Sequence, residues 1–199
     1  MLNTWNDKST TIRQGEELQL ENLQSYLQHF FDHKGDLKVT QFPSGYSNLT
    51  YLVQLGNSEY VLRRPPIGAN IKSGHDMKRE YDILTALKPN YGKVPAPILY
   101  CQDQTILGSP FYLMERVEGV ILRAKMPEEM IPSPELMQGI SNSFVDTFVD
   151  LHQLDVKEIG LADFGKPLGY MQRQIEGWTK RYNKSITDEI QCLIGKWPQ

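Results

Sequence analysis

Hydrophobic and polar residues alternate in short segments over the first part of the chain, which is the pattern of half-buried strands. Five segments fit this description, at about 37–42, 49–55, 59–64, 97–102 and 110–117. Gly56-Asn57 is a hairpin signal between the second and third segments. Pro65-Pro66 ends the third, because proline has no N–H to donate to a neighbouring strand. The pattern therefore predicts a sheet of five antiparallel strands.

Apolar residues at helical spacing predict two helices in the same part of the chain. The first lies at about 16–33, and its apolar face is formed by Leu20, Leu23, Leu27, Phe30 and Phe31. The second begins near Ser73 and Asp76, which have the spacing of a capping box. Its apolar positions are Met77, Tyr81, Leu84 and Leu87. One helix thus precedes the sheet and one is inserted into it.

After Gly119 the alternation stops and only helical spacing is found. A long buried helix is predicted at about 134–152 from Leu136, Ile140, Phe144, Phe148 and Leu151. Another helix is predicted from Met171, Ile175, Trp178 and Tyr182. A short last helix is predicted from Ile190, Leu193, Ile194 and Trp197.

Strands with one inserted helix, followed only by helices, indicate an α+β protein with two lobes. The connector near 117–121 is the expected boundary. We therefore predict an N-terminal lobe over 1–118, which includes the helix at about 16–33, and a helical C-terminal lobe over 119–199.

Composition narrows the classes of partner that we expect this protein to bind. The 199 residues are 40% hydrophobic, carry a net charge of −3 and contain no basic stripe interleaved with aromatic residues, so nucleic acid is not an expected partner. No apolar run approaches the roughly 18 residues that span a bilayer, so we expect no membrane association. The first residues do not resemble a signal peptide. Cys101 and Cys192 fit no C-x-x-C pattern and are read as free thiols of a cytoplasmic protein.

The loop between the first two strands is a candidate phosphate-binding turn. Small residues allow the backbone to come close to a ligand, and its N–H groups can then point at phosphate oxygens. The candidate residues are Ser44, Gly45, Tyr46, Ser47 and Asn48. Taken alone, the same segment fits an ordinary hairpin turn better.

The third strand carries a cation that can face a nucleotide. Side chains alternate along a strand, so Val61 and Arg63 share one face. A small apolar residue under a base and a cation two positions later near the phosphates fit a nucleotide site. Glu80, in the inserted helix, is the acid that would hold Arg63 toward the phosphates. The alternative is a solvated surface pair of about 0–1 kcal/mol.

The last strand runs into the connector between the lobes, where kinase folds bind adenine through backbone groups. Met114 ends the buried part of this strand. The Glu115 carbonyl is the expected acceptor and the Val117 N–H the expected donor. A strand cation, a helix acid and a connector in this order are the nucleotide-holding arrangement of kinase folds. A plain linker between two lobes is the alternative.

Several stretches together resemble the aminoglycoside phosphotransferase family, which shares the protein-kinase fold. They are similar to the subgroup related to the kinase-like domain of certain acyl-CoA dehydrogenases. The resemblance covers roughly residues 16–197. The stretches are FPSGYSNLTY (42–51), YVLRRPP (60–66), REY (79–81), VPAP (94–97), GSPFYLMERVEG (108–119), LHQLD (151–155) and GLADFGKPLGYMQRQ (160–174).

The resemblance implies an enzyme that uses ATP and Mg²⁺ to phosphorylate a hydroxyl group of a small molecule, with a hydroxyacyl thioester as one substrate class. It also implies that the catalytic Asp and the metal ligands lie beyond residue 199, since no Asp here has an Asn five positions later. No catalytic or metal-binding residue is therefore expected within this chain. The chain alone is predicted to be inactive, with exposed apolar helix faces that favour self-association.

Two details qualify the resemblance. The strand cation is Arg63, where protein kinases use lysine. The Asp163-Phe164-Gly165 triplet spells a kinase metal motif, but no catalytic loop precedes it, so we expect an ordinary loop away from the Arg63–Glu80 cleft. The competing function is a nucleotide-binding or pseudokinase module without catalysis. A helix-rich interaction domain that binds no nucleotide is the third possibility.

Overall fold

The computed structural model describes residues 8–31, 35–43, 48–68, 75–122, 128, 131–166 and 168–186. The chain forms two compact units, Met1–Ile159 and Gly160–Gln199. The first unit contains the sheet and four of the helices, and the second contains the last described helix. The lobe boundary predicted near residue 118 stays a prediction.

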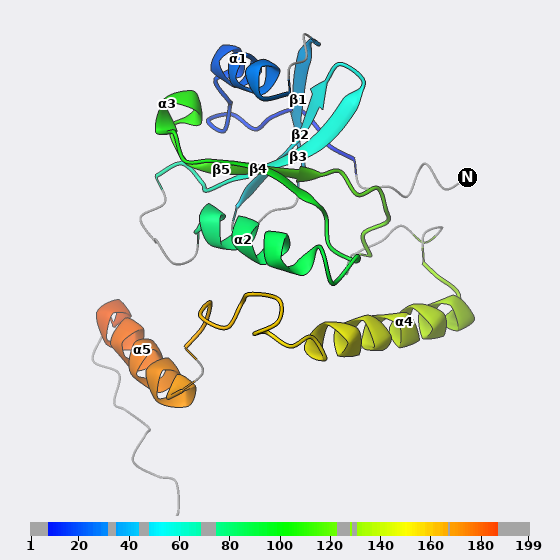
Figure 1. Ribbon diagram of the computed structural model, residues 1–199, viewed down its shortest axis with the longest axis vertical. Coiled ribbons are helices and arrows are strands. Elements are labelled where there is room, and N and C mark those ends of the chain that lie inside the picture. Colours follow the sequence, from blue (N-terminus) through cyan, green and yellow to red (C-terminus); the bar gives the residue numbers. More distant parts are fainter. Residues whose placement is uncertain are drawn as a thin grey trace, which may run out of the picture. The chain divides into compact units, whose positions relative to one another are not determined.

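The five predicted strands are all present, and they form one antiparallel sheet (Figure 1). Their order across the sheet is β1-β2-β3-β5-β4. Strands β3 and β5 each lie between two neighbouring strands. Their side chains alternate between the two faces of the sheet. The bounds are Leu37–Gln41 (β1), Leu49–Leu55 (β2), Ser58–Arg64 (β3), Pro97–Cys101 (β4) and Phe111–Glu115 (β5).

Five helices accompany the sheet in the described residues. Their bounds are Leu20–Phe31 (α1), Met77–Leu87 (α2), Gln104–Leu107 (α3), Pro134–His152 (α4) and Tyr170–Ser185 (α5). The short α3 was not predicted. Asp103 begins it by accepting a hydrogen bond from the Thr105 N–H, and Gly108 ends it with φ of 75°. The short final helix predicted near residue 194 lies outside the described residues.

Helix α1 is shorter than the predicted 16–33, because the residues before it form an extended N-terminal segment (8–19) that lies against the sheet. Thr10 pairs with Gln41 at the end of β1. The buried Gln41 side chain accepts from the Arg13 N–H at 2.9 Å and donates to Glu16 at 2.5 Å. Tyr51 donates to the Glu16 carbonyl at 2.7 Å. These bonds hold the backbone out of the helix.

The hydrophobic core lies between the sheet and the α1–α3 side. Leu23 and Leu27 of α1 are fully buried there, against Tyr51, Val53, Leu55, Leu62, Leu99, Phe111 and Leu113 of the strands. The opposite face of the sheet carries α2 (Figure 1). Because directly paired residues lie on the same face, the register pairs Val61↔Met114 and Arg63↔Tyr112 put all four side chains on the α2 face.

Helix α2 begins one residue after Asp76, which is its N-cap and not a later residue of a capping box. The Asp76 carboxylate accepts a hydrogen bond from the Arg79 N–H at 3.0 Å. Ser73, the other residue of the predicted box, lies outside the described residues. Asp76 is the capping residue, and its side chain satisfies one of the N–H groups that a helix start leaves unpaired.

We expect the Asp76→Ala variant to lower the free energy of unfolding by about 1 kcal/mol, because this capping bond is lost. The measurement is urea unfolding followed by circular dichroism. Asp36→Ala is the matched control, since Asp36 is exposed and begins no helix. Equal losses in the two variants would show that the cap contributes nothing.

Helix α4 has the predicted bounds, but the prediction that it is buried is wrong. None of its residues is buried, and Phe144 is 68% exposed. Polar contacts join α4 to the loop after α2: Tyr91 donates to the Thr147 carbonyl. Lys93 donates to the Thr147 hydroxyl at 3.2 Å and pairs with Asp150 at 2.8 Å. Helical periodicity shows that a helix has an apolar face, but it does not show what covers that face.

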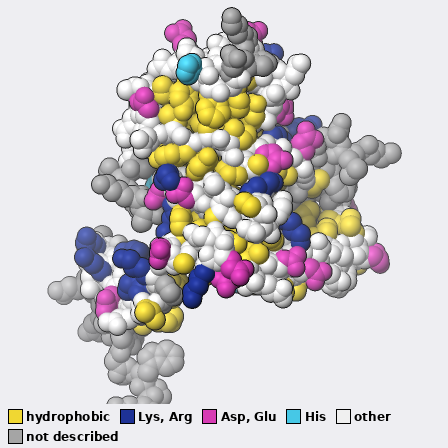
Figure 2. All heavy atoms as spheres, viewed as in Figure 1, with side chains coloured by type: hydrophobic (Ala, Val, Ile, Leu, Met, Phe, Trp, Pro, Cys, Tyr) yellow, Lys and Arg dark blue, Asp and Glu magenta, His cyan; other side chains and the backbone are white. Residues whose placement is uncertain are grey.

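The second unit likewise presents apolar side chains to solvent, with Met171 69% and Trp178 64% exposed on α5. Figure 2 shows hydrophobic side chains and a group of basic ones at the surface of this unit. Self-association through such faces stays a prediction. Of the helices that the structure describes, none combines the length and apolar character needed to cross a bilayer.

Candidate functional site

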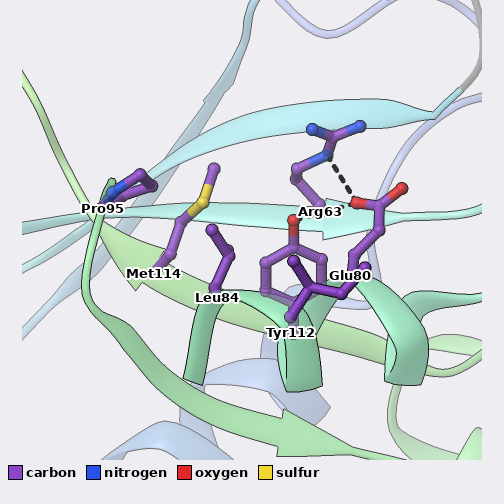
Figure 3. Close-up of a pocket in the computed structure, with 7 residues that line it drawn as sticks. Arg63, Glu80, Leu84, Pro95, Tyr112 and Met114 are labelled. Carbon is purple, nitrogen blue, oxygen red and sulfur yellow. Dashed lines mark hydrogen bonds and ion pairs between the residues drawn. The ribbon is translucent and has the colours of Figure 1, made fainter. Parts of the chain in front are cut away.

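Arg63 and Glu80 lie side by side on the α2 face of the sheet, as Figure 3 shows. Arg63 comes from β3 and Glu80 from the first turn of α2. The Arg63 Nε atom lies 3.5 Å from the Glu80 Oε2 atom, and each side chain is 31% exposed. The buried Nε atom makes no hydrogen bond with the part of the chain that the structure describes. The two residues therefore form a loose ion pair at the edge of solvent.

The Glu80 carboxylate is held by two other side chains, one at each oxygen. The Asn48 amide donates to Oε1 at 2.7 Å, and the Tyr112 hydroxyl donates to Oε2 at 2.9 Å. The other end of the Asn48 amide contacts the Nδ1 atom of His75 at 2.8 Å. Because the Asn48 oxygen only accepts, His75 carries its proton on Nδ1. Burial raises the pKa of the Tyr112 hydroxyl, which therefore remains a donor.

A cavity of about 380 Å³ opens beside this group of residues, between α2 and the sheet (Figure 3). Arg63 and Glu80 form its polar end. The rest of its wall is largely apolar: Ile83, Leu84, Pro95, Tyr112 and Met114. A mostly apolar pocket with a few converging polar groups is typical of a small-molecule site.

The structure separates two adjacent arginines. Arg63 faces the cavity, whereas Arg64 lies on the opposite face of the sheet and is only 6% exposed. Burial lowers the pKa of Arg64, and its Nε atom has no hydrogen-bond partner. Strand alternation in the sequence predicts this division. Of these two arginines, Arg63 is therefore the one that can meet a ligand in this cavity.

The end of β5 is fixed to the loop that precedes β4. The Glu115 N–H donates to the Ala96 carbonyl at 2.8 Å, and the Glu115 carboxylate accepts from the Ala96 N–H at 2.9 Å. This bond, together with Lys88, lowers the pKa of Glu115. Within the described residues the Val117 N–H has no hydrogen-bond partner. Met114 lines the cavity, and the predicted adenine contacts of Glu115 and Val117 stay predictions.

Four of the predicted loop residues, Ser44, Gly45, Tyr46 and Ser47, lie outside the described residues. Asn48 is described, and its amide binds Glu80. Tyr112 and His75 were not singled out from the sequence. The signal for Tyr112 was available, because it lies two positions before Met114 on the same strand and therefore on the same face.

Asp163 lies in an exposed turn before α5, as expected for a residue outside a catalytic loop. Its predicted distance from the Arg63–Glu80 pair stays a prediction. In the described ranges, no three or more His, Cys, Asp and Glu side chains are grouped so that they can hold a metal ion.

Comparison with known proteins defines the class of this chain. A sequence profile described as the phosphotransferase enzyme family matches residues 38–197. The chain belongs to this family. The predicted resemblance and the predicted kinase-like α+β fold are therefore confirmed.

Among the similar proteins is the rat (Rattus norvegicus) acyl-CoA dehydrogenase family member 11, which is 39% identical over 181 residues. The human (Homo sapiens) protein of that name is 34% identical over 186 residues. These matches cover 87% and 89% of this chain and 23% of each relative. The chain thus spans about a quarter of the length of these relatives.

A solved structure, described as that of a candidate aminoglycoside phosphotransferase from Ralstonia eutropha, has the same fold. It superposes with a TM-score of 0.68 at 32% sequence identity. The match covers 87% of this chain and 50% of that one.

Proposed function

We propose that this chain is the ATP-binding portion of a kinase that transfers the γ-phosphate of ATP to a hydroxyl group of a small molecule. The observation that carries the proposal is the Arg63–Glu80 pair at the polar end of an apolar cavity, in a chain of the phosphotransferase family. A cation held by an acid beside an apolar pocket suits a ligand with an anionic and an aromatic part.

The residues present fit a nucleotide. The buried Arg63 Nε atom makes no hydrogen bond, and a guanidinium has five N–H donors, so the ion pair with Glu80 leaves donors for phosphate oxygens. Val61 and Met114 offer apolar contact on the same face of the sheet. The Glu115 carbonyl and the Val117 N–H would bind the edge of the base. Bound Mg²⁺ would neutralise phosphate charge.

A nucleotide-binding or pseudokinase module is the second candidate. The observation that favours it is that no Asp in the chain is followed five positions later by Asn, the spacing of the family's catalytic loop. For the acceptor we propose a hydroxyacyl thioester, because relatives carry acyl-CoA dehydrogenase names. Cys101 is a buried free cysteine, which accords with a reducing compartment, and we propose the cytoplasm.

Thermal unfolding with and without MgATP tests nucleotide binding. A ligand that binds only the folded chain stabilises it by about 2.7 kcal/mol at a concentration 100 times its dissociation constant. We therefore expect the melting temperature to rise with MgATP and not with equal concentrations of MgCl₂ or inorganic phosphate. A melting temperature that MgATP leaves unchanged up to millimolar concentrations would contradict the proposal.

We further expect the 199-residue chain alone to show no substrate-dependent ADP release. Phosphoryl transfer depends on positioning and charge stabilisation, and this chain offers groups for ATP but none that orient the attacking hydroxyl. The measurement is a coupled ADP assay with a panel of small hydroxylated acceptors, including a hydroxyacyl thioester. The full-length rat relative assayed in parallel is the comparison. Turnover by the chain at a rate similar to that of the relative would contradict this expectation.

A further inference from the structure

Glu80 differs from a simple partner of Arg63, because two neutral donors hold its carboxylate more closely than the arginine does. The Asn48 and Tyr112 bonds measure 2.7 and 2.9 Å, whereas the Arg63 Nε atom is 3.5 Å away and makes no hydrogen bond. Arginine and carboxylate normally form two parallel, charge-assisted bonds at about 2.7–2.9 Å. Arg63 and Glu80 therefore lack the two parallel hydrogen bonds of a typical arginine–carboxylate pair.

The arrangement of the three side chains explains the long distance. Figure 3 shows the Tyr112 hydroxyl and the Arg63 Nε atom directed at the same carboxylate oxygen of Glu80. Tyr112 is 1% exposed and Asn48 is 3% exposed, so packing fixes the position of both donors. His75, at 2.8 Å from the Asn48 oxygen, holds the amide with its nitrogen toward Glu80.

We propose that Tyr112 and Asn48 are positioning residues that occupy Glu80 and so keep the guanidinium fork of Arg63 available for a phosphate group. This inference rests on the proposed function of the site. Glu80 supplies the charge that keeps Arg63 in the cavity, while the two neutral donors prevent the closer bridge. The role fits an arginine in particular, because a guanidinium offers carboxylate and phosphate the same planar fork, so the two compete for it.

The first test is MgATP binding measured by calorimetry for the Tyr112→Phe variant. The ring is retained and one hydroxyl is lost, so Arg63 can close on Glu80, and we expect the dissociation constant to rise about fivefold or more. Tyr81→Phe is the matched control, since the Tyr81 ring lies 6.3 Å from that of Tyr112 and its hydroxyl makes no hydrogen bond in the described residues. Wild-type affinity in Tyr112→Phe would overturn the proposal.

A double-mutant cycle separates positioning from a general structural effect. The Arg63→Ala variant has no guanidinium that could bind Glu80 in place of the nucleotide. In that background we therefore expect Tyr112→Phe to change nucleotide affinity little. An undiminished loss in that background would overturn the proposal, because Tyr112 would then act through another group. A crystal structure of Tyr112→Phe gives a readout without nucleotide: two N–H···O bonds between Arg63 and Glu80 are expected, and an unchanged 3.5 Å separation counts against the proposal.

Two further outcomes keep the test decisive. If Tyr112→Phe does not fold, the Asn48→Ser variant removes the donor at the other oxygen of Glu80 and carries the same expectation and the same contrary result. If the wild-type chain itself does not bind MgATP, the proposed function fails and this inference with it. Wild-type binding with unaffected variants overturns the positioning role alone.

Discussion

The Arg63→Ala variant should bind MgATP about 10- to 100-fold more weakly than the wild-type chain. A hydrogen bond between a charged donor and an anion contributes about 1.5–3 kcal/mol, and each 1.4 kcal/mol is a factor of ten in the dissociation constant. Arg63 is the cation at the polar end of the cavity, whereas its neighbour Arg64 faces the other side of the sheet. Calorimetric titration with MgATP measures the loss.

Lys38→Ala is the control for this change, because it also removes one positive charge. Lys38 is an exposed residue of the edge strand β1 and does not line the cavity. We expect it to retain wild-type affinity, and thermal unfolding of both variants shows whether they are folded. Equal affinities of Arg63→Ala and wild type for MgATP would show that Arg63 does not contribute to nucleotide binding.

The Leu27→Ala variant should lower the free energy of unfolding by about 3 kcal/mol. Leu27 is fully buried in the core between α1 and the sheet, so its truncation loses apolar burial and leaves a cavity. Small domains are stable by only about 5–15 kcal/mol, so this loss is a large part of the total. Chemical denaturation with guanidinium chloride measures it.

Leu20→Ala, on the same helix, is the matched control. Leu20 is 44% exposed, so the same substitution removes little buried surface, and we expect a loss well below that of Leu27→Ala. Similar losses at the two positions would show that α1 does not pack on the sheet in the way described. The pair thus tests the position of this helix directly.

The sheet was predictable because its determinants are local. Alternation along β2 and β3 and the Gly56-Asn57 turn fix the register and place Arg63 and Arg64 on opposite faces. The position of Arg63 near Glu80 also followed from order along the chain. What Glu80 itself binds did not, because Asn48 lies just before β2 and Tyr112 lies on β5, and both meet Glu80 only through the packing of α2 on the sheet.

Helix ends and burial were less predictable for related reasons. The start of α1 depends on Gln41, a distant residue whose buried amide holds the N-terminal segment extended. The exposure of Phe144 on α4 was expected from the resemblance and not from the periodicity, which only defines a face. In both cases the deciding interaction is tertiary and leaves no mark in the local pattern.

The N-terminal segment also affects the choice of boundaries for a recombinant fragment of this protein. The family profile begins at residue 38, after both this segment and α1. A recombinant fragment trimmed to that limit would lack Leu23 and Leu27, uncover one face of the sheet, and leave the Gln41 amide and the Tyr51 hydroxyl without their partners. The unit that folds is therefore longer than the unit that the family profile defines.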